Sequence, residues 1–136
     1  MKKARSSEAS RGEEPTLRPA RVPIVLIAGG PDQLLSAAQQ VAGDESPAIV
    51  VEACGALAVA TAAATLRPFA LVLNQDIFAF DPDEFAALAN AVGAELVVVK
   101  VLDGGAAAPL EQALRPSLRA AFRRFRTEAE SGSVKR

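Results

Sequence analysis

The sequence contains no histidine, tryptophan or tyrosine, and its single cysteine is Cys54. Without histidine, a Cys–His pair and histidine-based general acid–base catalysis are excluded. One cysteine permits no internal disulfide, which agrees with a reducing cytoplasm. No segment approaches the roughly 20 uninterrupted apolar residues of a membrane-spanning helix, and the first residues lack the apolar core of a signal peptide. We therefore expect a cytoplasmic protein with no membrane partner.

The sequence also has little excess of charge of either sign, because 15 Lys and Arg residues nearly balance 16 Asp and Glu residues. A formal net charge of −1 argues against a dedicated nucleic-acid binder. A chain of 136 residues is long enough to bury one core, so we expect one domain at residues 21–128. Residues 1–20 mix Ser, Glu, Arg, Gly and Pro without periodicity, which predicts a disordered leader. Residues 129–136 are expected to form a flexible tail.

Short apolar runs alternate with helical patterns along the whole domain. The runs predict strands at 23–28, 48–51, 69–76 and 95–101, and the helical patterns begin at Pro31, Ala56, Asp81 and Leu110. Asp81, Pro82 and Glu84 form a capping box at the start of the third helix. Strict alternation predicts an α/β fold: a three-layer parallel sheet of about four strands, ordered 2-1-3-4, with helices on both faces and a long C-terminal helix.

The third predicted strand, 69–76, is the centre of this arrangement. Its continuous apolar run suits a strand that is buried on both faces. Asn74, Gln75 and Asp76 then fall at its carboxyl end, which is where open α/β sheets place their chemistry. The less specific alternative is that these three residues cap the strand end by hydrogen bonds to neighbouring loops.

Residues 23–101 resemble the first four strands and three helices of a bacterial response-regulator receiver domain, which has a flavodoxin-like fold. Leu66-Arg-Pro-Phe-Ala-Leu-Val-Leu-Asn74 is similar to that family's third-strand signature, which ends on the phosphorylated aspartate. Ile24-Val-Leu-Ile-Ala-Gly-Gly-Pro-Asp32 resembles its first strand and the turn that bears an acidic pair. The resemblance implies a role in bacterial signalling.

The residues that carry the family's reaction are nevertheless replaced. Gly29 and Gly30 stand where the acidic pair belongs, Asn74 stands at the nucleophile position, and Lys100 or Val101 replaces a hydroxyl side chain. A neutral amide is neither a useful nucleophile nor a charged Mg²⁺ ligand. Taking Asp76 as the acceptor instead restores no acidic partners. The resemblance therefore implies a degenerate receiver with no catalytic residue, no metal and no cofactor.

Two other features have both a chemical and a structural explanation. The turn Gly29-Gly30-Pro31 could present backbone N–H groups to a phosphate, but a tight strand-to-helix turn explains it equally simply. Cys54 could be a low-pKa thiol near a helix N-terminus, although cysteine is commonly buried as a small hydrophobe. We favour the structural explanation for both. The acidic residues Asp76, Asp81, Asp83 and Glu84 suggest a cation site, but helix capping already accounts for two of them.

The last predicted helix carries two stripes at helical spacing. The apolar stripe consists of Leu114, Leu118, Phe122 and Phe125, and the basic stripe of Arg115, Arg119, Arg123 and Arg126. One explanation makes the first stripe core and the second a solvated face. The other is a docking face, because arginine beside phenylalanine suits interfaces. As candidate partner-binding residues we take Arg115, Arg119, Phe122, Arg123 and Arg126.

The sequence thus favours a non-enzymatic, receiver-like signalling adaptor that acts through protein contacts. Its expected partner is another regulatory protein or a second copy in a homodimer, and not a nucleic acid. The alternative is a domain that binds a small anion or nucleotide at the sheet edge formed by Gly29, Gly30, Asn74 and Lys100, with Gln75 and Asp76 beside it. An enzyme of another kind is a third possibility, which the absence of histidine disfavours.

Overall fold

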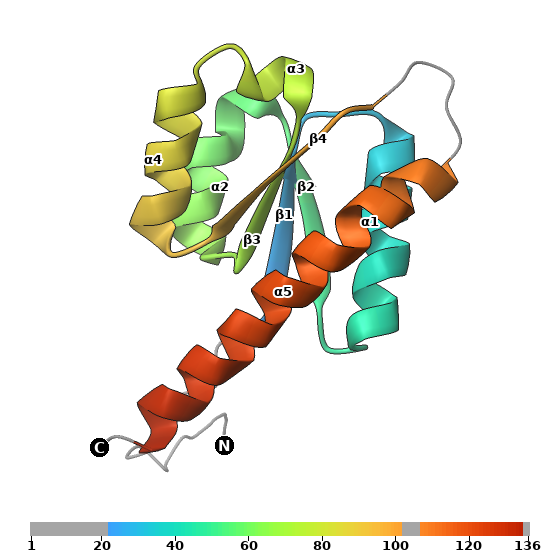
Figure 1. Cartoon of the computed structure of the whole chain (residues 1–136). Coiled ribbons are helices and arrows are strands. Elements are labelled where there is room, and N and C mark those ends of the chain that lie inside the picture. Colours follow the sequence, from blue (N-terminus) through green and yellow to red (C-terminus); the bar gives the residue numbers. More distant parts are fainter. Residues whose placement is uncertain (1–21, 102–106, 135–136) are drawn as a thin grey trace, which may run out of the picture.

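The sheet of the computed structural model has the predicted order and direction. The structure describes residues 22–101 and 107–134, so the predicted leader lies outside the described residues. Four parallel strands follow the order β2-β1-β3-β4 (Figure 1). Their bounds are β1 Ile24–Ala28, β2 Val50–Cys54, β3 Ala70–Asn74 and β4 Glu95–Val99. The predicted α/β fold class is therefore confirmed.

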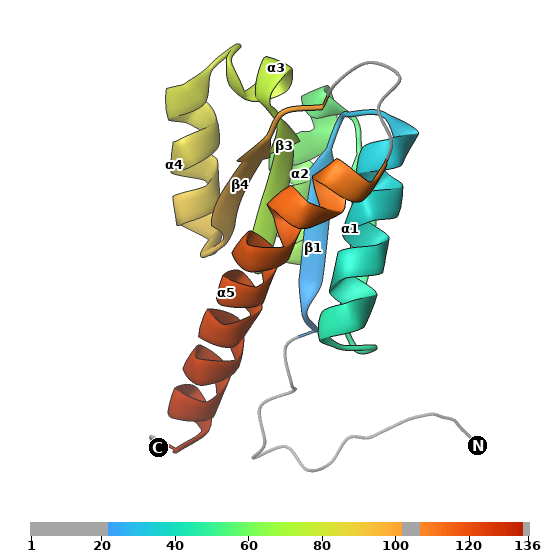
Figure 2. The ribbon, with the colours of Figure 1, turned by 45° about the vertical axis from the view of Figure 1, so that its right-hand side comes forward.

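Helices cover both faces of this sheet (Figures 1 and 2). On one face lie α1 (Asp32–Glu45) and α5 (Ala107–Val134), whose apolar residues form one core cluster with side chains of β1, β3 and β4. On the other face, α2 (Val59–Leu66) and α4 (Pro82–Val92) form a second cluster with the alternate residues of the strands. Because side chains of a strand point alternately to the two faces, the continuous apolar runs of β1 and β3 supply both clusters. No helix in the described part of the chain is both long and apolar enough to cross a membrane.

Several element boundaries differ from those expected. The third strand ends at Asn74, and Gln75 begins a short helix, α3 (Gln75–Phe78). The second strand begins at Val50, because Ala48 and Ile49 belong to a turn in which the N–H of Ile49 donates to the carbonyl of Ser46. It continues to Cys54 and is followed by a 3₁₀ turn at Ala56–Ala58. The fourth strand ends at Val99, so Lys100 lies just beyond it.

The last helix is longer than its sequence pattern predicts. It runs from Ala107 to Val134 and contains Pro116 without interruption. Its predicted apolar stripe does face the core: Leu114, Leu118 and Phe125 are buried, and Phe122 is partly buried against the same cluster. The core explanation of that stripe is therefore confirmed.

Candidate functional site

An open pocket of about 410 Å³ lies at the carboxyl ends of β1 and β2. The register pairs Ala28 with Cys54, and the backbone N–H of Gly29 donates to the carbonyl of Cys54 at 2.7 Å. This pairing brings the glycine turn after β1 against the end of β2. The pocket is lined by Ile27, Gly29, Gly30, Pro31, Asp32, Leu35, Ala53, Cys54 and Gly55.

The glycine turn has two structural reasons for its composition. Gly29 and Gly30 have φ values of +69° and +96°, in the region that side chains rarely adopt. A Cβ on Gly29 would also stand 2.2 Å from Cδ1 of Ile77, because α3 packs over the turn. Backbone conformation and close approach therefore require glycine at position 29 whether or not a ligand binds.

The N-terminus of helix α1 lies at the pocket and presents backbone N–H groups to it. Its N-cap residue, Pro31, supplies no side-chain cap, and its carbonyl accepts from the N–H groups of Leu34 and Leu35. The first N–H groups of a helix lack partners within the helix, so the N–H of Asp32 is available to an anion in the pocket. The exposed carboxylate of Asp32 acts in the opposite sense, because it already complements the helix dipole and repels a second anion.

Cys54 lines this pocket at the end of β2, and its side chain packs against the cluster under α2 and α4. Its side chain is half-buried, and desolvation by burial raises the pKa of the thiol above its ordinary value. The thiol is therefore protonated at neutral pH. The pocket lining contains no lysine or arginine that would favour the thiolate.

The other predicted edge residues do not line this pocket. Asn74 accepts a hydrogen bond at its Oδ1 from the N–H of Asp76 at 3.4 Å, and so caps α3. Gln75 and Asp76 are exposed on that helix, and Lys100 is exposed beyond β4, with β3 between it and the glycine turn. The capping explanation fits Asn74. The structure brings Gly29 and Gly30 together with Cys54, a combination that sequence reasoning missed because the end of β2 was placed too early.

The acidic residues after β3 serve the next helix. Asp81 accepts from the N–H of Glu84 at 3.2 Å, which confirms it as the N-cap of α4. Across residues 22–101 and 107–134, no three Cys, Asp or Glu side chains gather in a way that would hold a metal ion.

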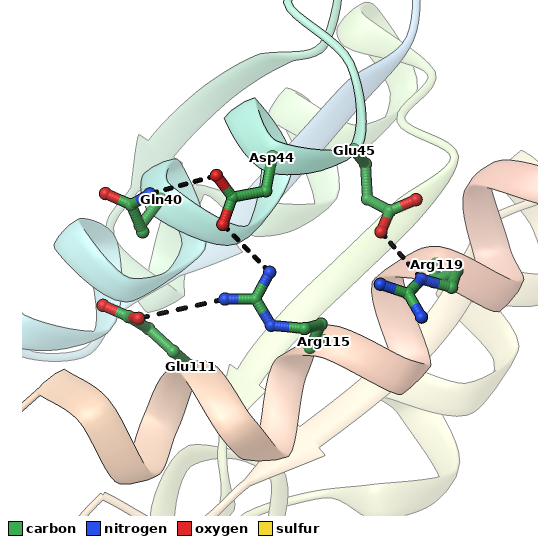
Figure 3. Close-up of polar contacts among 6 residues, drawn as sticks. All are labelled: Gln40, Asp44, Glu45, Glu111, Arg115 and Arg119. Atoms are coloured by element: carbon green, nitrogen blue, oxygen red, sulfur yellow. Dashed lines mark hydrogen bonds and ion pairs between the residues drawn. The ribbon is translucent and has the colours of Figure 1, made fainter.

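Two arginines of the basic stripe hold α5 against α1 (Figure 3). Nη1 of Arg115 lies 2.9 Å from Oδ2 of Asp44, and Nε of Arg119 lies 2.8 Å from Oε2 of Glu45. The hydrogen bond from Arg115 is the main reason that the pKa of Asp44 lies below its ordinary value. Because carboxylates are disfavoured at a helix C-terminus, the arginines offset an unfavourable feature of α1. Their guanidinium groups are thus engaged within the chain.

The remaining members of the candidate partner-binding set lie further along α5. The guanidinium carbon of Arg126 lies 5.9 Å from the ring centroid of Phe122, and that ring packs 5.6 Å from Phe69. Arg123 is exposed. A partner-binding role for this part of the stripe stays a prediction.

Comparison with protein-family models finds no match, and neither does comparison with curated proteins. Among solved structures, the chain is similar to the lactose-specific IIB component of the phosphoenolpyruvate:carbohydrate phosphotransferase system from Streptococcus pneumoniae. The TM-score is 0.52 at 14% sequence identity, and the match covers 72% of this chain and 95% of that chain. At this identity, the likeness shows the fold.

This finding corrects the predicted family and the function drawn from it. The similar structure is a phosphotransferase-system component and not a response-regulator receiver. The receiver assignment, the non-catalytic signalling adaptor and the prediction that the chain is not an enzyme are therefore wrong. The receiver resemblance rested on apolar strands and short turns, which any doubly wound parallel sheet requires. Such a pattern does not distinguish one α/β family from another.

Proposed function

We propose that this chain is a phosphoryl-transfer domain that receives a phosphoryl group on Cys54, in the pocket between β1 and β2. The observation that carries the proposal is that Cys54, the only cysteine of the chain, lines one pocket with a glycine turn and the start of α1. The fold likeness to a component of a sugar phosphotransferase system supports it. Glycine turns that open a helix are suited to phosphate, since their backbone N–H groups and the helix dipole both favour an anion.

The chemistry is a nucleophilic displacement at phosphorus. The thiolate of Cys54 attacks, the S–P bond forms, and the bond between phosphorus and the donor breaks with its electron pair going to the donor. The proton of the thiol goes to solvent beforehand. Backbone N–H groups of Gly30 and Asp32 would stabilise the phosphoryl oxygens during the transfer.

The isolated domain is a poor acceptor, and this implies a protein donor. Burial raises the pKa of Cys54, the chain has no histidine, and no cation lines the pocket. A docking protein must therefore bring the positive charge that favours the thiolate. Two large apolar side chains at the same end of the sheet suit such docking: Leu57 is fully exposed and Phe80 is 89% exposed. The proposed partner is another component of a phosphoryl-transfer chain in the cytoplasm.

Phosphoramidate, a small phosphodonor, tests the proposal on the purified chain. At mildly alkaline pH, where some thiolate forms while the donor nitrogen is still partly protonated and can leave as ammonia, the intact mass should rise by one phosphoryl group, and peptide mapping should place that group on Cys54. The Cys54→Ser variant should remain unmodified under the same conditions. An unmodified wild-type chain, or a phosphoryl group on another residue, would refute the proposal.

Asp32 supplies a second and independent readout. Asp32→Asn removes the carboxylate that opposes an anion at the pocket, so it should accelerate the modification of Cys54. Asp83→Asn is the matched control, because Asp83 occupies the first turn of α4 and does not line the pocket. Equal rates for the two variants would show that the anion does not enter beside α1.

A further inference from the structure

The outer edge of β4 lies open at one side of the sheet. The strand order places β4 last, and among the described residues no strand pairs beyond it. Its two faces are covered, since Val97 and Val99 belong to the cluster under α1 and α5, and Leu96 packs against the cluster under α2 and α4. The edge itself offers unpaired backbone N–H and C=O groups to another chain.

The two edges of the sheet differ in how they discourage pairing. At the opposite edge, β2 carries the exposed carboxylate of Glu52 at its middle position. On β4 the exposed side chain is Val98, the fourth of its five residues, within the apolar run that follows Glu95. Charged side chains on an edge strand are a common protection against strand addition, so β2 is protected at its middle, whereas β4 carries a charge only at its first residue.

We propose that β4 pairs with β4 of a second copy of this chain, in an antiparallel arrangement centred on Val98. A two-fold axis that passes between the two Val98 residues joins the two four-stranded sheets into one of eight strands. The face covered by α1 and α5 then lies on the same side of the sheet in both copies. Val98, which is 38% exposed in the single chain, then covers its own counterpart. Val97 lies opposite Val99 of the other copy, on the face that packs against α1 and α5.

Charge favours the antiparallel direction over the parallel one. The strand begins at Glu95, and the exposed Lys100 follows its last residue. Antiparallel pairing brings the Lys100 end of one strand beside the Glu95 end of the other, whereas parallel pairing would set like charges together. Glu95 already pairs with Arg124, but its carboxylate is 42% exposed and can accept a second cation.

This surface is separate from the phosphoryl-transfer pocket, so the inference does not depend on the proposed function. The pocket lies between β1 and β2, and β3 separates those strands from β4. Both pockets of the dimer therefore stay open to a docking partner.

Analytical ultracentrifugation of the full chain over a concentration series tests the pairing. Wild type should reach twice the monomer mass in a reversible equilibrium. Val98→Lys places two lysines directly opposite each other and should weaken the association by about tenfold or more. Val50→Lys is the matched control, because Val50 is 40% exposed on β2 and should leave the association unchanged.

A charge swap tests the position of the axis. Val98→Glu alone should also weaken the association, whereas an equimolar mixture of Val98→Lys and Val98→Glu should restore it, because opposite charges meet at the axis. A monomeric wild type at millimolar concentration, or a mixture that does not recover, overturns the proposal. If a variant misfolds, amide hydrogen exchange of the wild-type chain still tests the proposal, because it needs no substitution. Protection of β4 should rise with protein concentration, and protection that rises in β2 instead counts against the pairing.

Discussion

Replacing Gly29 with alanine should destabilise the fold by about 2 to 4 kcal/mol. Two separate costs add. A non-glycine residue at φ +69° costs about 1 to 2 kcal/mol. A Cβ placed 2.2 Å from Cδ1 of Ile77 forces that side chain to move, and overpacking of this kind costs about 1 to 3 kcal/mol. Cδ1 is the flexible end of its side chain, which keeps the total below the sum of the upper values.

A double-mutant cycle separates the two costs. Ile77→Val removes the Cδ1 atom that the new methyl group would strike and leaves the backbone unchanged. In that background Gly29→Ala should cost about 1 to 2 kcal/mol less than in wild type, because only the backbone strain remains. The size of this coupling measures how closely α3 packs on the turn after β1.

Urea unfolding monitored by far-UV circular dichroism is the suitable assay, because the chain has no tryptophan or tyrosine for fluorescence. Gly55→Ala is the control: Gly55 has φ −74°, and a Cβ there meets nothing within 4 Å. It should stay within about 0.5 kcal/mol of wild type. The reasoning is refuted if Gly29→Ala is equally mild, or if Ile77→Val leaves its cost unchanged.

Three further predictions concern helices. Because its pKa is lowered on folding, Asp44 stabilises the fold above its unfolded pKa, and that stabilisation is lost as pH falls through the folded value. Arg115→Ala should therefore lower the urea midpoint at neutral pH and low salt, and the difference should shrink in high salt and well below the usual aspartate pKa of about 4. Leu114→Ala, which truncates a fully buried side chain of α5, should cost about 2 to 5 kcal/mol in the same unfolding assay. Asp81→Ala should cost about 1 kcal/mol through loss of the α4 cap, and Asp83→Ala, which leaves the Asp81 cap in place, should cost less.

The sequence determines the sheet because its strand signals agree with each other. β1 and β3 are continuous apolar runs, and each is followed by a helix with its own start signal, so a parallel sheet is the consistent solution. Asp81 was identifiable as a cap because the capping box is a local pattern of four residues. Features that depend on neighbouring residues along the chain were thus predictable.

Features that depend on contacts between residues distant in sequence were not predictable. Placing the end of β3 at Asp76 made Gln75 and Asp76 look like edge residues, whereas Gln75 already begins α3. Asn74 caps this helix, and Ile77 packs it over the glycine turn. Likewise, the register that pairs Ala28 with Cys54 is set by the whole β1–β2 pairing, so the position of Cys54 beside the glycine turn had no local signal.

The packing of Ile77 also decides which variants can test whether the pocket binds phosphate. Because Gly29→Ala disturbs the turn without any ligand, loss of phosphoryl transfer in that variant would say nothing about a role of Gly29 in binding. Gly30 has the same limitation, since its φ is +96° and a Cβ there stands 3.0 Å from Leu34. Cys54→Ser changes one atom at the end of β2 and Asp32→Asn changes one atom on an exposed carboxylate, so neither should alter the turn. These two positions, and not the glycines, therefore distinguish a phosphoryl-transfer pocket from a tight turn that serves the fold alone.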